Sequence, residues 1–119
     1  MIYVGNDIID ISRIKINIDN YGHLFLKKIF SKREINYCNS KKYPAMHFAG
    51  KFAAKEAVLK AVNQYDDSVS CFLKDIEIIN DAKSKPLALI DNRGLKKIKI
   101  QISISHTKQF ATSIAILFL

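Results

Sequence analysis

The spacing of apolar residues changes from helical to alternating near position 72, and this change restricts the possible folds more than any other feature. Before it, over residues 14–30, apolar residues recur every three or four positions, which is the spacing of one helical face. After it, apolar and polar residues alternate as in half-buried strands, most strictly over Lys99 to Ile104. This order predicts an α+β domain with helices packed early and a mainly antiparallel sheet late.

Length and composition indicate a single domain over residues 1–119, because 49% of the side chains are hydrophobic and no Pro-, Gly- or Ser-rich run suggests a linker. Cys38 and Cys71 lack the spacing of a metal site, which favours a reducing compartment. The first apolar stretch has no basic leader, and no apolar stretch is long enough for a bilayer. We therefore expect a cytoplasmic protein without a membrane partner.

The elements are predicted from these patterns and from capping signals. We expect helical segments over residues 14–30, with one buried face despite Gly22, from Ser31 through a capping box with Glu34, and over residues 44–63. Strands are expected over residues 2–11, 74–80, 87–91, 98–105 and 110–119.

Small residues mark two places where another group can come close. Gly5 lies inside the first predicted strand, where a bulge or a second backbone would explain the missing side chain. Alanines recur at four-residue spacing on the long predicted helix, which leaves room for a backbone or a ligand. These alanines are Ala49, Ala53, Ala57 and Ala61.

The net charge of +8, from 19 Lys and Arg against 11 Asp and Glu, favours an acidic partner. Nucleic acid, an anionic membrane surface, a polyphosphate ligand and an acidic protein all satisfy this condition. The charge alone narrows the partners and leaves the chemistry open.

Two carboxylates are candidates for chemistry. Asp7 stands among Ile8 and Ile9, where a carboxylate needs a partner. It is either a strand-end group held by backbone N–H groups or water, or a metal ligand. Glu56 is the second candidate, although with Lys60 four residues later it could form a surface ion pair only. Together Asp7 and Glu56 fit Mg²⁺, which binds one or two carboxylates and substrate phosphates.

Basic and hydroxyl groups could complete a diphosphate site. Lys51, Lys55 and Lys60 would stand near the same phosphates as point charges. The predicted turn at residues 83–86 is an ordinary hairpin by default, and His106 could be a plain turn residue. The segment 103–107, which ends a predicted strand with hydroxyls and an imidazole, could also hold a phosphate.

Four motifs resemble the holo-acyl-carrier-protein synthases, the small stand-alone phosphopantetheinyl transferases, over nearly the whole chain. They are Gly5-Asn6-Asp7-Ile8 with Asp10 and Arg13-Ile14, Phe48 to Ala57 with Lys60-Ala61, Asp75 to Ile78 with Asn80-Asp81 and Lys85-Pro86, and Ser103 to Thr107. Four positions depart from the family pattern: Lys51 replaces the usual Arg, Ser84 replaces the usual Gly, Asn6 replaces an apolar residue, and Asn63 stands where Gly commonly ends the middle helix.

The resemblance implies transfer of 4′-phosphopantetheine from coenzyme A to a serine of apo acyl carrier protein, with release of adenosine 3′,5′-bisphosphate, in support of fatty acid synthesis. It further implies that Asp7 and Glu56 bind Mg²⁺. For the reaction itself we expect two catalytic residues: Glu56 as general base for the serine proton, directly or through a metal-bound water, and Lys60 as stabiliser of the departing phosphate. A homotrimer with active sites between subunits is expected.

The resemblance also assigns binding residues. Those matching positions used around coenzyme A are Lys51, Lys60, Lys85, Pro86, Ser105, His106 and Thr107. Contacts with the acidic carrier protein are expected from Arg13, Lys27 and Lys28. The alternatives are a small basic nucleic-acid-binding module, against which Asp7 and Glu56 argue because they would repel phosphates, and a carrier-binding scaffold without catalysis.

Overall fold

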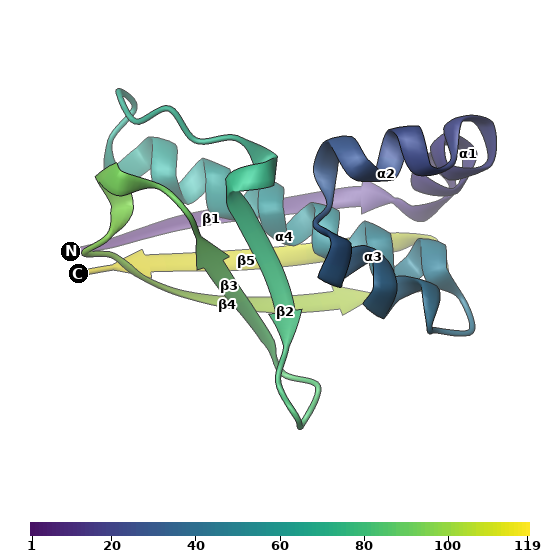
Figure 1. The fold of residues 1–119 in the computed structure, drawn as a ribbon. Helices are drawn as coiled ribbons and strands as arrows, with labels where there is room; N and C mark the ends of the chain where they lie inside the picture. The colour runs from purple at the N-terminus through teal and green to yellow at the C-terminus, as the bar shows by residue number, and fades with distance from the viewer.

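The computed structural model describes residues 1–119 and has the α+β organisation expected from the sequence (Figure 1). The helices come first and most of the strands follow, after an initial strand. In chain order the elements are β1 (Ile2–Asp10), α1 (Ile11–Tyr21), α2 (His23–Ile29), α3 (Lys32–Asn39), α4 (Pro44–Tyr65), η1 (Leu73–Asp75), β2 (Ile76–Asn80), β3 (Pro86–Ile90), η2 (Arg93–Leu95), β4 (Lys99–His106) and β5 (Phe110–Phe118).

The strands form two antiparallel sheets. One sheet has the order β1-β5-β4, in which the last strand of the chain pairs with the first, and the other is the β2-β3 hairpin. Burial alternates along β4 and β5, as the period-two pattern predicts. One face of the three-stranded sheet therefore packs inward and the other faces out.

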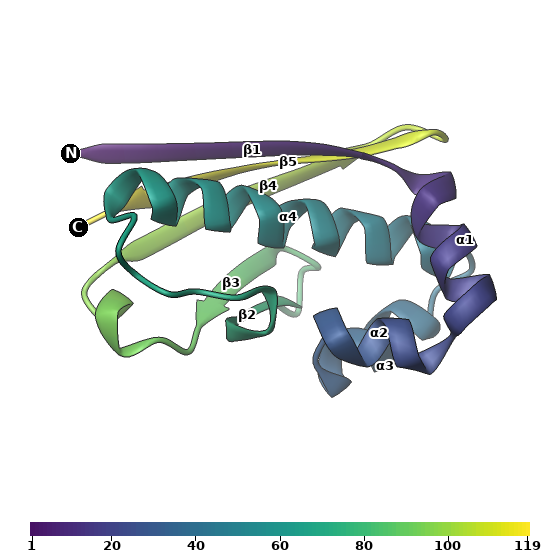
Figure 2. The ribbon, with the colours of Figure 1, turned by 90° about the horizontal axis from the view of Figure 1, so that it is seen from above.

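Helix α4 lies between the two sheets and is the centre of the molecule (Figure 2). The three-stranded sheet covers one side of it, and the hairpin with α2 and α3 lies on the other. Its buried residues point in all directions around the helix axis, which is typical of a helix enclosed on every side. None of the helices combines the length and apolar character needed to span a membrane.

Most predicted elements agree with the structure, and one needs correction. The capping box of Ser31 and Glu34 begins α3 as predicted. The expected helical face over residues 14–30 is broken at Gly22, whose φ of 55° ends α1 and starts α2. Because of this break, Tyr21 and Leu24 are 61% and 60% exposed and do not belong to the buried face.

The close approach expected at Gly5 is made by α4. A Cβ atom built on Gly5 would overlap the carbonyl oxygen of Ala57 and would lie 2.8 Å from the amide nitrogen of Ala61. Ala57 and Ala61 are buried, so the alanine row supplies the matching surface. Strand β1 and helix α4 thus touch backbone to backbone at this point.

A buried charge pair joins α3 to α4. The Nζ of Lys55 lies 2.7 Å from Oε1 of Glu34, and the two residues are 0% and 1% exposed. Glu34 also accepts from the backbone N–H groups of Ser31 and Ile78, and Lys55 also donates to the carbonyl of Ile29. Burial lowers the pKa of Lys55, and Glu34 opposes this by favouring the ammonium form.

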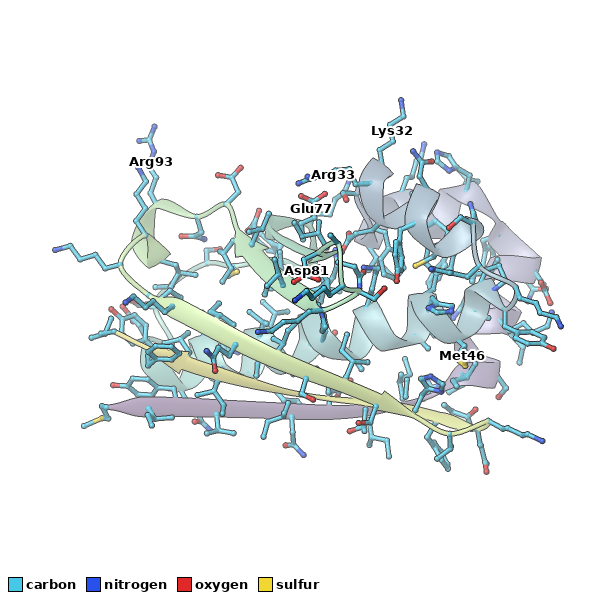
Figure 3. The ribbon with its side chains drawn as sticks, turned by 90° about the horizontal axis from the view of Figure 1, so that it is seen from below. Lys32, Arg33, Met46, Glu77, Asp81 and Arg93 are labelled. Atoms are coloured by element: carbon cyan, nitrogen blue, oxygen red, sulfur yellow. The ribbon has the colours of Figure 1, made fainter.

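At the surface a second set of polar contacts ties α3 to β2. Arg33 and Glu77 lie next to each other in Figure 3, and Nε of Arg33 donates to Oε2 of Glu77 at 3.1 Å. The Ser31 hydroxyl donates to the same oxygen at 2.6 Å. Arg33 and Ser31 hold the pKa of Glu77 below its usual value. The N-terminal cap of α3 is therefore held by Glu34 in the core and by Glu77 at the surface.

The variant Gly5→Ala tests the contact between β1 and α4. It should lower the free energy of unfolding by about 1–3 kcal/mol, because the added methyl group forces two backbones apart. Gly94→Ala is the matched control, since its added Cβ would lie no closer than 3.4 Å to any atom, and it should change stability by less than about 0.5 kcal/mol. Urea unfolding at one protein concentration measures both, and equal stability of the two variants would contradict the packing argument.

The variant Glu34→Gln should lower the free energy of unfolding by about 3–5 kcal/mol, because it leaves the buried ammonium of Lys55 without a counter-charge. As a control, Asp19→Asn breaks the pair between Lys15 and Asp19, whose side chains are 64% and 59% exposed, and should cost less than about 1 kcal/mol. The double variant Glu34→Gln/Lys55→Met should recover part of the loss. Equal costs for Glu34→Gln and Asp19→Asn in thermal unfolding would sink this account of the core.

Candidate active site

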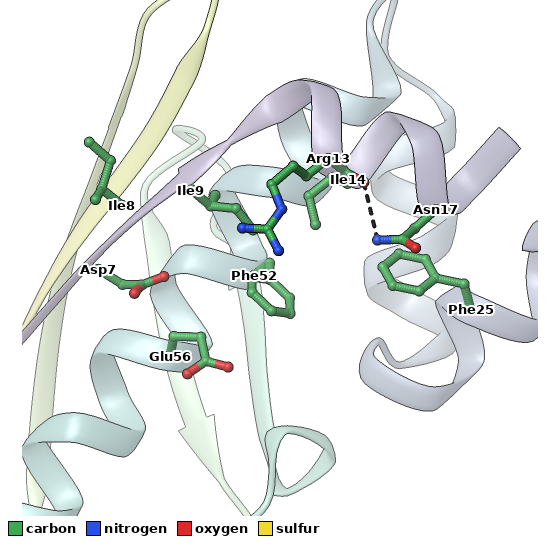
Figure 4. Close-up of a pocket in the computed structure, with 9 residues that line it drawn as sticks. All are labelled: Asp7, Ile8, Ile9, Arg13, Ile14, Asn17, Phe25, Phe52 and Glu56. Atoms are coloured by element: carbon green, nitrogen blue, oxygen red, sulfur yellow. Dashed lines mark hydrogen bonds between the residues drawn. The ribbon is translucent and has the colours of Figure 1, made fainter. Parts of the chain in front are cut away.

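A pocket of about 270 Å³ lies between β1, α1 and α4, and Asp7 and Glu56 both face it (Figure 4). We call it the carboxylate pocket. Asp7 lies on the inward face of β1, two residues beyond Gly5, and Glu56 precedes Ala57 on α4. The contact at Gly5 therefore sets the separation of the two carboxylates. The other lining residues are Ile8, Ile9, Arg13, Ile14, Asn17, Phe25 and Phe52.

The partner that Asp7 needs is Lys60, not a backbone group. The Nζ of Lys60 lies 3.2 Å from Oδ1 of Asp7 and donates to the carbonyl of Asn6 at 2.9 Å. The surface ion pair considered for Glu56 and Lys60 is not formed. Burial raises the pKa of Glu56, the negative charge of Asp7 adds to the effect, and Lys60 opposes it.

The donor set of this pocket suits a hard cation. Two carboxylates face one space, and no third Asp, Glu, His or Cys joins them. A site with few carboxylates and room for water and phosphate oxygens fits Mg²⁺ better than zinc, which is bound by three or four protein ligands. Asp7 and Glu56 would hold the metal.

A second pocket, of about 210 Å³, lies at the other edge of the sheet, where α3, α4, the β2-β3 hairpin and the end of β4 meet. We call it the histidine pocket because His47 and His106 both line it. Lys51 and Pro86 line it too, so three of the residues expected around coenzyme A come together here.

The remaining predicted coenzyme A residues line neither pocket, although Lys60 lies beside Asp7 and pairs with it. Ser105 is exposed on β4. The hydroxyl of Thr107 accepts from the backbone N–H groups of Gln109 and Phe110 and so closes the turn between β4 and β5. The backbone N–H of Lys85 donates to Asp81 in the hairpin turn.

We expected three lysines around one diphosphate, and this prediction is wrong for Lys55, because its ammonium group is buried in an ion pair with Glu34. Lys51 also points away from the carboxylate pocket. It is 4% exposed, and its Nζ donates to the carbonyl of Ile78 and, at 2.8 Å, to Oδ1 of Asn80. Only Lys60 stays with the carboxylates.

The expected carrier-binding residues lie on the early helices. Arg13 of α1 lines the carboxylate pocket, and its guanidinium lies near Phe52 in Figure 4. Lys27 and Lys28 are exposed in the last turn of α2. His47 was not singled out from the sequence, since a histidine on a helix with no metal-ligand spacing gives no signal.

The two pockets cannot form one site within a single chain. His47 and Glu56 are nine residues apart on α4, about two and a half helical turns, so they lie on opposite sides of it. The pockets also lie at opposite edges of the sheet, beside β1 and beside β4. The predicted site residues are thus divided between two edges of the molecule.

Comparison with known proteins agrees with these motifs. A family model described as the 4′-phosphopantetheinyl transferase superfamily matches residues 3–115. The holo-[acyl-carrier-protein] synthase of Protochlamydia amoebophila is 45% identical over 117 residues, which cover 95% of this chain and 94% of that protein. The enzyme of that name from Chlamydia trachomatis serovar D is 41% identical and covers 98% of both chains.

Solved structures give the same result for the fold. The Helicobacter pylori holo-[acyl-carrier-protein] synthase in complex with coenzyme A is 29% identical, with a TM-score of 0.83 and coverage of 97% of this chain and 99% of that one. The Neisseria meningitidis enzyme is 25% identical over the full length of both chains, with a TM-score of 0.85. This chain therefore belongs to the holo-acyl-carrier-protein synthases of the 4′-phosphopantetheinyl transferase superfamily.

Proposed function

We propose that the chain transfers 4′-phosphopantetheine from coenzyme A to a serine hydroxyl of apo acyl carrier protein and releases adenosine 3′,5′-bisphosphate. The observation that carries the proposal is that Asp7 and Glu56, 49 positions apart in the sequence, face one pocket with Lys60 beside them. The relatives' name and the coenzyme A in the Helicobacter pylori structure support both substrates. The family match favours this enzyme over a nucleic-acid-binding module.

In this reaction the serine oxygen attacks the phosphorus attached to the pantetheine arm. A new O–P bond forms, and the bond from that phosphorus to the bridging oxygen of the adenosine-linked phosphate breaks. Glu56, which faces the same pocket as Asp7, takes the serine proton as the general base. Lys60, whose side chain is 53% exposed, can turn its ammonium toward the departing phosphate.

Mg²⁺ held by Asp7 and Glu56 would neutralise the charge that spreads over the diphosphate. The chain's own residues supply the rest by positioning and charge, which carry most of the catalysis in phosphoryl transfer. Lys60 holds Asp7 in place through its bonds to Oδ1 and to the carbonyl of Asn6. Phe52 lines the pocket beside Glu56 (Figure 4).

We further propose that the complete site forms between copies in a homotrimer. The division of the predicted residues between two edges supports this, because one copy would bring the carboxylate pocket and its neighbour the histidine pocket. The outer face of the three-stranded sheet gives a surface for assembly. It is apolar and exposed at Ile2, Val4, Ile8 and Ile114.

The acidic carrier protein would approach from the helical end of the molecule. Arg13 at the rim of the carboxylate pocket and the exposed Lys27 and Lys28 of α2 present positive charge on that side. Complementary charge there would steer the carrier serine toward Glu56.

The transfer itself is tested by incubating the protein with apo acyl carrier protein, coenzyme A and Mg²⁺ and weighing the carrier protein by mass spectrometry. A gain of one phosphopantetheine, lost with EDTA, is expected. Asp7→Asn and Glu56→Gln should each lower the rate by about 100-fold or more, because each removes a charge at the reacting diphosphate.

Asp67→Asn is the matched control for these variants. Asp67 is an exposed carboxylate in the loop after α4, outside both pockets, and its loss should leave the rate unchanged. Near-normal transfer by either Asp7→Asn or Glu56→Gln, with unchanged circular dichroism, would remove that residue from the site. No transfer to any carrier protein over a range of Mg²⁺ concentrations would overturn the proposed function.

The assembly is tested by light scattering after gel filtration. The unchanged chain should have the mass of a trimer, and Ile114→Glu should be monomeric, because it places a charge at the centre of the outer sheet face. Ile16→Glu is the control, since Ile16 is 57% exposed on α1, away from the sheet, and should leave the mass unchanged. A trimer that survives Ile114→Glu would mean that another surface holds it together.

A further inference from the structure

The histidine pocket contains more positive charge than its own side chains can compensate. Lys51, His47 and His106 line it, and none of its lining residues is Asp or Glu. The ammonium of Lys51 is almost completely buried, and its hydrogen-bond partners are a carbonyl and an amide oxygen, both uncharged. Glu34 and Glu77 also favour the charged form of Lys51, but they form their ion pairs with Lys55 and Arg33. A buried cation whose direct partners are all uncharged is costly, and a bound anion would relieve that cost.

His47 is placed where its protonation responds to such an anion. Its ring packs edge-on against Tyr37, with ring centroids 6.2 Å apart, and the ammonium groups of Lys41 and Lys51 each lie 4.6 Å from the centre of the same Tyr37 ring. His106 faces it from the end of β4. Burial and the positive charges of Lys41, His106 and Lys51 lower the pKa of His47, so its imidazole is neutral at neutral pH.

The chemistry of coenzyme A suggests which anion belongs here. The molecule carries a diphosphate and, separately, a phosphate monoester on the 3′-oxygen of its ribose. If the diphosphate lies at Asp7 and Glu56, the monoester is left for a basic site elsewhere. A volume of about 210 Å³ has room for a phosphate group, while the lysine and the histidines supply N–H donors.

We propose that His47 is a proton-dependent ligand of the 3′-phosphate of coenzyme A, acting with Lys51 and His106. This rests on the proposed function and names a residue and a regulation of that same reaction. Binding of the dianion replaces the repulsion around His47 with attraction, so His47 takes up a proton as the phosphate enters. By linkage, affinity for the phosphate rises as pH falls from about 8 to about 6.

The proposal is tested by calorimetry with coenzyme A and with dephospho-coenzyme A, which lacks only the 3′-phosphate. The ratio of the affinity for coenzyme A to the affinity for dephospho-coenzyme A should be at least about threefold greater near pH 6 than near pH 8. In His47→Phe, which keeps a ring against Tyr37, this pH dependence should be lost, and in His47→Lys the preference should stay high at both pH values. The phosphate's own titration affects all variants equally, so the difference between variants isolates His47.

His23→Gln is the matched control, because His23 is an exposed histidine of α2, outside both pockets, and its loss should leave the pH dependence intact. A second readout is the imidazole proton resonance that disappears in His47→Phe. Its pKa should rise when adenosine 3′,5′-bisphosphate is added and should not rise with adenosine 5′-monophosphate.

An unchanged pH dependence in His47→Phe, or an imidazole that both nucleotides shift equally, would overturn the role of His47. Transfer to the carrier protein would then still stand. A failure of the proposed function itself differs, because coenzyme A and dephospho-coenzyme A would then both fail to bind. Even then, the pocket can be tested by adding inorganic phosphate and following the imidazole resonance of His47. If phosphate does not shift that resonance, the proposed phosphate site at His47 is rejected.

Discussion

The buried pair of Glu34 and Lys55 is the contact on which the rest of the structure depends. Its carboxylate gathers donors from three elements: the cap of α3 at Ser31, the amine of Lys55 on α4 and the backbone N–H of Ile78 on β2. A charged pair with no access to water tolerates little movement, because every lost bond leaves a buried charge unsatisfied. It therefore fixes the rotation of α4 about its axis, and both pockets have walls on that helix.

The local structure could be predicted because its causes are local. Alternation along β4 and the reciprocal bonds of Ser31 and Glu34 depend on residues close in sequence, and both were confirmed. The break at Gly22 was missed, because the apolar spacing continues across it while the backbone there adopts a positive φ. Spacing reports which side chains could share a face, and the backbone decides whether they do.

The candidate site was predictable in its residues but less so in its pairings. Lys60 has Glu56 one turn away, yet it binds Asp7, because β1 brings a second carboxylate and a carbonyl alongside α4. In the sequence Lys55 looks as suitable for binding phosphate as Lys51 and Lys60 do. Only the fold shows that its ammonium group pairs with Glu34 of another helix. Long-range pairing of this kind leaves no periodic trace in one sequence.

The absence of a side chain at Gly5 has a consequence for how the active site withstands change. Asp7 and Glu56 are spaced by two main chains in direct contact, not by a layer of interlocking side chains. A side chain added at Gly5 would therefore change the distance between the carboxylates as well as the stability of the fold. The same residue serves both, because it lets β1 and α4 touch and so places Asp7 opposite Glu56.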